Sequence, residues 1–151
     1  MIQRKQTLFL LFSIIILVGY IFSPIIRVED AGLGTNIFGY DLKKNIPFPI
    51  IGRYFVYITL DAAITAIVLN LITIFLYKKR KWQMAFCWLS LIPVVFAFCF
   101  TYYHWATTDS TSDTVFYYGN ISLGVSVVFI LLAWFFIKKD EELVKSLDRL
   151  R

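Results

Sequence analysis

Four consecutive cations, Lys78, Lys79, Arg80 and Lys81, stand between two long apolar runs, and this feature most constrains how the chain can fold. Charged side chains are costly in the hydrocarbon core of a bilayer, so the cations must lie outside it while the flanking runs cross it. The linker has room only for a tight turn between antiparallel helices. Because Lys and Arg in short loops stay cytoplasmic, these residues, here named the basic turn, predict a cytoplasmic turn that orients the chain.

The composition also indicates a membrane protein. The 151 residues are 59% hydrophobic and 19% aromatic, values too apolar for a soluble domain of this size. The net charge of +5 would fit a nucleic-acid-binding module if the cations shared one folded face. Here the cations stand at the ends of apolar runs, so the expected partner is the lipid bilayer and no nucleic-acid partner is expected.

Four apolar runs have the length of about 20 residues that a membrane-spanning helix needs. The expected spans cover residues 7–26, 54–77, 82–103 and 115–137. Outside loops are expected at 28–53 and 104–114, and a cytoplasmic tail at 138–151. We therefore expect an all-α fold in which residues 1–151 form a single membrane domain, an antiparallel four-helix transmembrane bundle with a cytoplasmic C-terminal helical tail.

The distribution of cations predicts that both termini are cytoplasmic. Eleven of the 15 Lys and Arg residues fall at the ends and connections assigned to the cytoplasm, and the connector 104–114 contains neither residue type. The other four cations belong to the first outside loop or its edges. In that loop, the alternation from Thr35 to Tyr40 and the turn after it predict a short hairpin on the membrane surface.

Small residues in two of the runs predict how two helices pack. In the fourth run they recur at intervals of three, four and seven, which places them on one helical face: Gly119, Ser122, Ser126 and Ala133. Ala62 and Ala66 form a similar notch in the second run. Small side chains allow neighbouring backbones to approach closely, so we expect these two helices to pack against each other.

Asp61 is the single acidic residue inside an apolar run. A carboxylate within a span is costly and is usually paired, protonated or functional. One interpretation is a structural carboxylate bonded to neighbouring tyrosines or water. The other is an outward-facing polar pocket of residues at matching depth: Asp61, Arg53, Tyr102, Tyr103, His104, Tyr117, Tyr118 and Asn120. In such a pocket His104 with the carboxylate would make a proton relay, whereas an interfacial aromatic belt explains the tyrosines without one.

The C-terminal tail has the pattern of an amphipathic helix that continues the fourth span beyond the bilayer. Leu143, Leu147 and Leu150 lie on one side together with Val144, and Glu141 stands four positions before Lys145 in the favourable ion-pair order. We expect the three leucines to contact a partner protein.

Chemical motifs are scarce. Cys87 and Cys99 are twelve positions apart in one helical run, too far for a disulfide, and with one histidine they do not build a usual zinc site. No nucleotide-binding loop or hydrolase motif is present. We expect no metal and no cofactor, and a non-enzymatic role is favoured over an enzymatic one. The basic turn is either a topology anchor alone or also a binding site for anionic lipid head groups.

The two ends of the chain carry a family resemblance. Residues 1–7, MIQRKQT, and residues 139–151, KDEELVKSLDRLR, resemble a bacterial family of short membrane proteins that is known as a domain of unknown function. The resemblance covers the middle of the chain only in its layout of four spans. It implies a multi-pass protein of the bacterial inner membrane and draws attention to the cytoplasmic ends as a contact surface.

Two classes of function remain. The first is a non-enzymatic accessory or scaffold subunit of a larger membrane assembly, with a membrane-protein partner or a second copy of the chain bound to it. The second is a small transporter, channel subunit or membrane enzyme that uses an outer-leaflet polar pocket around Asp61.

Overall fold

The computed structural model describes the backbone of residues 5–30, 33–38, 50–77, 79–107 and 118–149, and the side chains of residues 5–23, 57–77, 79–103 and 119–146. Within these ranges the chain forms helices α1 (Lys5–Phe22), α2 (Ile50–Phe75), α3 (Arg80–Thr107) and α4 (Tyr118–Arg149), and strands β1 (Pro24–Asp30) and β2 (Leu33–Phe38).

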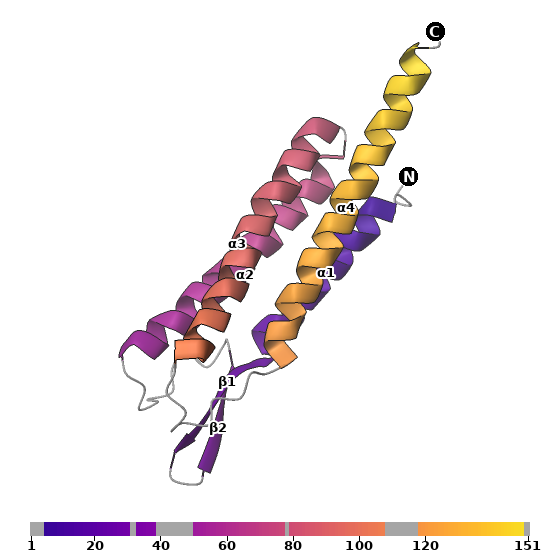
Figure 1. Cartoon of the computed structure of the whole chain (residues 1–151). Helices are drawn as coiled ribbons and strands as arrows, with labels where there is room; N and C mark the ends of the chain where they lie inside the picture. The colour runs from indigo at the N-terminus through magenta and orange to yellow at the C-terminus, as the bar shows by residue number, and fades with distance from the viewer. Residues whose placement is uncertain (1–4, 31–32, 39–49, 78, 108–117, 150–151) are drawn as a thin grey trace.

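The helices form an antiparallel bundle in which neighbours in sequence are neighbours in space (Figure 1). α1 packs against α2 and α4, and α3 packs against α2 and α4, so α2 and α4 occupy diagonally opposite corners of the described bundle. The start of α1, the α2–α3 turn and the end of α4 lie at one end, named here the basic end. The hairpin of β1 and β2 lies at the other, the hairpin end. The predicted all-α four-helix bundle is thus confirmed.

Each of the four described helices is long and apolar enough to cross a membrane. Their candidate spans contain 18, 19, 24 and 28 residues, with mean hydropathies of 2.0 to 2.3. The chain is therefore a multi-pass membrane protein.

The buried positions of every helix alternate at intervals of three and four residues. In α1 they are Gln6, Leu10, Ser13, Leu17 and Tyr20. In α2 they are Thr59, Ala63, Ala66, Asn70 and Thr73. In α3 they include Gln83, Cys87, Ser90, Val94, Ala97 and Thr101, and in α4 they include Asn120, Leu123, Ser126, Ile130, Ala133 and Ile137. An average spacing of about 3.5 residues keeps one face of each helix toward its partners, as in a left-handed coiled coil.

Polar residues occupy many of these core positions, while large apolar residues face outward. Phe12, Ile15 and Phe75, for example, are exposed on the outside of the bundle. Lipid tails are as apolar as these side chains, so a bilayer provides no reason to bury them, whereas a polar group in hydrocarbon lacks a partner. The polar side chains therefore gather on the bundle axis.

Several buried hydroxyls are satisfied within their own helix, and a further polar contact joins two helices. Thr73 Oγ1 donates to the Leu69 carbonyl at 2.7 Å and Ser90 Oγ donates to the Cys87 carbonyl at 2.9 Å. Between helices, the Asn70 amide Nδ2 donates to Ser13 Oγ at 3.3 Å, which ties α2 to α1 in the middle of the bundle.

Aromatic rings pack α4 against both of its neighbours, α1 and α3. Phe9 of α1 stacks on Phe136 with ring centroids 5.2 Å apart, and Trp88 of α3 meets Trp134 edge to face at 5.7 Å. Offset and edge-to-face pairs are the favourable arrangements for aromatic rings. These contacts hold α4 between α1 and α3.

The first helix is shorter than expected. It ends at Phe22 instead of Ile26, because Pro24 lacks the amide needed to continue the helix. The Ser23 hydroxyl donates to the Gly19 carbonyl at 2.8 Å and its amide donates to the Tyr20 carbonyl at 3.1 Å, which closes the helix end.

The predicted hairpin exists with a different register. β1 pairs antiparallel with β2, and Asp30 lies opposite Leu33, so the hairpin turn precedes the Thr35 segment instead of following it. β1 contains residues 24–26, which the sequence predicts as the end of the first span. The helix limits also differ from expectation at Ile50, where α2 begins before residue 54, and at Thr107, where α3 passes residue 103.

Several of the small residues lie in the interior, and the main described neighbours of α2 are α1 and α3. Ala66, Ser126 and Ala133 are fully buried, yet α2 and α4 are diagonal partners in the described bundle. Ala62 lines an outward-facing apolar groove with Leu89 and other residues of α3. Short connections place consecutive helices side by side, so α3 is the nearer neighbour of the notch.

Replacing Ala66 by Leu should destabilise the bundle by about 1–3 kcal/mol, because the buried notch has no room for three more carbons. The adjacent Thr65→Leu variant is the control, since Thr65 is exposed and should change stability little. Thermal unfolding in detergent measures both. Equal melting temperatures for the two variants would contradict a tightly packed interior at Ala66.

Candidate functional site

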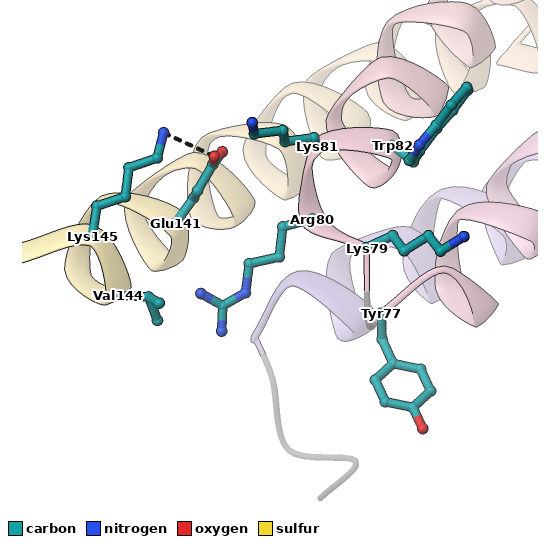
Figure 2. Close-up of a pocket in the computed structure, with 8 residues that line it drawn as sticks. All are labelled: Tyr77, Lys79, Arg80, Lys81, Trp82, Glu141, Val144 and Lys145. Carbon is teal, nitrogen blue, oxygen red and sulfur yellow. Dashed lines mark ion pairs between the residues drawn. The ribbon is translucent and has the colours of Figure 1, made fainter. Parts of the chain in front are cut away.

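A groove at the basic end of the bundle is lined by residues of two separate segments (Figure 2). The α2–α3 turn and the start of α3 contribute Tyr77, Lys79, Arg80, Lys81 and Trp82, and α4 contributes Glu141, Val144 and Lys145. The groove, named here the basic groove, has a volume of about 680 Å³.

Backbone hydrogen bonds fix the shape of the basic turn. The Leu76 amide donates to the Ile72 carbonyl at 3.0 Å, and the Lys79 amide donates to the Leu76 carbonyl at 2.9 Å. The Gln83 amide then donates to the Lys79 carbonyl at 3.0 Å, which starts α3 at Arg80. Lys79, Arg80 and Lys81 are therefore held at a short connection between the two helices.

Arg80 links the turn to the fourth helix. Its guanidinium Nη1 donates to the backbone carbonyl of Asp140 at 3.0 Å, across 60 positions of sequence. Figure 2 shows the side chain extending from the start of α3 into the space beside α4. A charged donor makes a stronger hydrogen bond than a neutral one, so this contact holds α4 against the turn at the point where α4 leaves the bundle.

The basic groove carries an excess of positive charge. Four cations line it together with a single carboxylate, Glu141, among the described residues. Lys145 Nζ lies 2.9 Å from Glu141 Oε1, and the carboxylate side chain is 13% exposed whereas Lys145 is 63% exposed. The carboxylate of Glu141 is thus largely shielded from solvent, whereas the ammonium of Lys145 is exposed.

Aromatic residues indicate the depth of the groove relative to the bilayer. Trp82 and Tyr77 are both more than half exposed, and such amphipathic rings favour the boundary between hydrocarbon and head groups. Lys138 lies 5.5 Å from the centroid of the Trp134 ring, a cation–π contact on α4. The groove therefore lies where the bilayer gives way to its polar surface.

The structure describes four side chains of the expected outer pocket. Asp61, Tyr102 and Tyr103 are exposed, whereas Asn120 is buried in the core. The outer pocket therefore stays a prediction. Four further members of the set fall outside the described side chains: Arg53, His104, Tyr117 and Tyr118.

The hairpin end holds a polar cluster that the sequence interpretation missed. Tyr20, Thr59 and Thr101 come from three different helices and are all buried. The Tyr20 hydroxyl lies beside Thr59 and Thr101. The signal in the sequence is a spacing of seven residues, which keeps side chains on one helical face. It relates Gln6, Ser13 and Tyr20 in α1, and Thr59, Ala66 and Thr73 in α2.

The described side chains hold no group of three or more His, Cys, Asp or Glu residues that could bind a metal. Cys87 is buried and Cys99 is exposed, and both are free thiols.

The tail forms the end of α4. The helix continues to Arg149, and Leu143 and Val144 are 56% and 40% exposed. The side chains of Leu147 and Leu150 lie outside the described residues. The Glu141–Lys145 pair forms with the spacing that the sequence predicted.

Comparison with known protein families identifies the family of this chain. A family model matches residues 2–150, which include all the described helices and both strands. The chain belongs to DUF4293, a domain of unknown function. No curated protein and no solved structure matches it. The family resemblance drawn from the two ends of the chain is thereby confirmed, and the fold described here supplies a structure for a DUF4293 protein.

Arg80 provides a direct test of how the groove is held together. Arg80→Gln should release α4 from the turn and lower the free energy of unfolding by about 1–2 kcal/mol, because a charged donor to Asp140 is lost. Spin labels at Lys79 and Ser146, in a background without the native cysteines, should then give a broader distance distribution.

Lys81→Gln is the matched control, since it removes the same charge from the groove without a described hydrogen bond to α4. An Arg80→Gln distribution as narrow as that of Lys81→Gln would contradict the role given to Arg80.

Proposed function

We propose that this DUF4293 protein is a non-enzymatic accessory or scaffold subunit of a larger assembly in the bacterial inner membrane. In this proposal residues 1–151 form one membrane domain, and both termini are cytoplasmic. The observation that carries the proposal is the projection of α4 beyond the bundle with apolar side chains exposed on it.

The length of α4 exceeds what a membrane span requires. Its 32 residues extend over about 48 Å at 1.5 Å per residue, compared with a hydrocarbon core of about 30 Å. The contact of Arg80 with Asp140 marks where α4 leaves its neighbours. The last part of α4 projects past the α2–α3 turn, as its yellow end shows (Figure 1).

The projecting segment carries apolar surface at a level where water replaces lipid. Leu143 is exposed there, and each Å² of apolar surface left in water costs about 25 cal/mol relative to burial. An amphipathic helix of this kind typically places its apolar residues in a groove of a partner. Leu147 and Leu150 follow at the spacing that would extend the same face, so the three leucines form the proposed partner contact.

The charge distribution supports a cytoplasmic location for this contact. The basic turn, the start of α1 and the end of α4 lie together at one end of the bundle. Short connections rich in Lys and Arg remain on the cytoplasmic side of bacterial membranes. The proposed partner is therefore a cytoplasmic protein or the cytoplasmic part of another membrane protein; a second copy of the chain would instead appear as a homo-oligomer on sizing.

The alternative of a small transporter, channel subunit or membrane enzyme is less well supported. Asp61 is exposed on α2 instead of facing the polar core. Leu10, Leu17 and Ile130 are fully buried, and these apolar side chains separate the polar positions along the axis. A transport site usually places ionisable groups in the bundle interior.

Leu143→Glu should reduce the amount of co-purifying partner protein at least tenfold, because a carboxylate replaces an apolar contact on the projecting face. The measurement is affinity purification of the tagged full-length protein from its native membrane, followed by quantitative mass spectrometry. Glu142→Gln is the control, because it changes one charge at an exposed position about 100° around the helix from Leu143 and should keep the partner set.

The melting temperature in detergent checks that both variants retain the bundle. Identical partner sets for Leu143→Glu, Glu142→Gln and the unaltered protein would refute the proposed contact.

A further inference from the structure

We propose that the basic groove binds the phosphate head group of an anionic phospholipid. The lipid would lie between the basic turn on one side and the α4 extension on the other. This proposal goes beyond the scaffold function and does not depend on it, since a topology anchor or a partner-binding helix needs no lipid site.

The geometry distinguishes this groove from a basic loop that only orients the chain. Orientation depends on the number of Lys and Arg residues in a short loop and not on their arrangement. Here α4 adds Lys145 to the cations of the turn, and the hydrogen bond from Arg80 to Asp140 holds the two walls together. A volume of about 680 Å³ gives room for a head group between them.

The charges suit a phosphate group. Glu141 is paired with Lys145 and largely shielded, while the ammonium of Lys145 stays mostly exposed. A lysine ammonium has three donor hydrogens, so Lys145 can keep its contact with Glu141 and also donate to a phosphate oxygen. Lys79 and Lys81 are exposed on the opposite wall. Basic pockets beside transmembrane helices are typical sites for anionic lipid head groups.

The surroundings favour a lipid over a free phosphate ion. Trp82 and Tyr77 line the groove and are exposed, which places the site at the head-group level of the bilayer. Phe75, two positions before Tyr77 at the end of α2, is 78% exposed and offers an apolar surface for an acyl chain. The site thus combines a cationic head-group region with an adjoining hydrophobic surface.

The lipid and the proposed protein partner would use different faces of α4. Glu141, Val144 and Lys145 face the groove. Leu143 precedes Val144 by one residue, which rotates it by about 100° around the helix axis. A bound head group would therefore bridge the turn and α4 without covering the leucine face.

The test uses the full-length protein in detergent and native mass spectrometry to measure lipid binding. Phosphatidylglycerol and cardiolipin are the anionic probes, phosphatidylcholine is the neutral probe, and inorganic phosphate is the soluble probe. We expect both anionic lipids to bind at least tenfold more tightly than phosphatidylcholine. The double variant Lys79→Gln/Lys81→Gln should lower their affinity at least tenfold, at about fivefold per cation.

Lys138→Gln/Lys139→Gln is the matched control, because it removes two exposed cations of α4 that do not line the groove. It should change the affinity less than threefold. Equal losses in the two double variants would show a diffuse attraction and overturn the proposal. An absence of preference for anionic lipids, or phosphate binding as tight as lipid binding, would overturn it as well.

Discussion

The structure depends on keeping polar groups away from hydrocarbon. In a bilayer an unpaired polar group has no water to bind, so helices place polar side chains against one another and leave apolar ones outside. Asn70 and Ser13 show this directly, since their hydrogen bond joins α2 to α1 in the interior. Small and polar residues at intervals of three and four then bring the backbones close. The same constraint explains why Phe12 and Ile15 are exposed.

The fourth helix connects the membrane part of the protein to its aqueous end. Within the bundle it is held by aromatic contacts, including the stacking of Phe136 on Phe9. At the end of the bundle the carbonyl of Asp140 accepts a hydrogen bond from Arg80. Beyond that point α4 has one face toward the basic groove and another, marked by Leu143, that is exposed. A lipid-binding role and a partner-binding role would therefore both depend on how Arg80 positions α4.

Much of the fold could be predicted from the sequence, because the length of an apolar run and the position of Lys and Arg report directly on membrane spans. The rotation of each helix could not be predicted from depth alone. Asp61 and Asn120 were placed in one pocket by depth, but the first faces outward and the second faces the core. Small residues likewise show that a helix face is packed but not which neighbour makes most of the contacts there. The basic groove combines Arg80 with Lys145, and their proximity depends on helix order.

The most direct test of the account is a spin-label scan of α1, residues 5–22, that measures the accessibility of each position to molecular oxygen in a bilayer. Oxygen concentrates in the hydrocarbon core, so outward positions should give high values. The account predicts minima at Gln6, Leu10, Ser13, Leu17 and Tyr20, and maxima at positions such as Phe12 and Ile15. Minima at Phe12 and Ile15, or accessibility without a helical period, would contradict a bundle that encloses its polar residues.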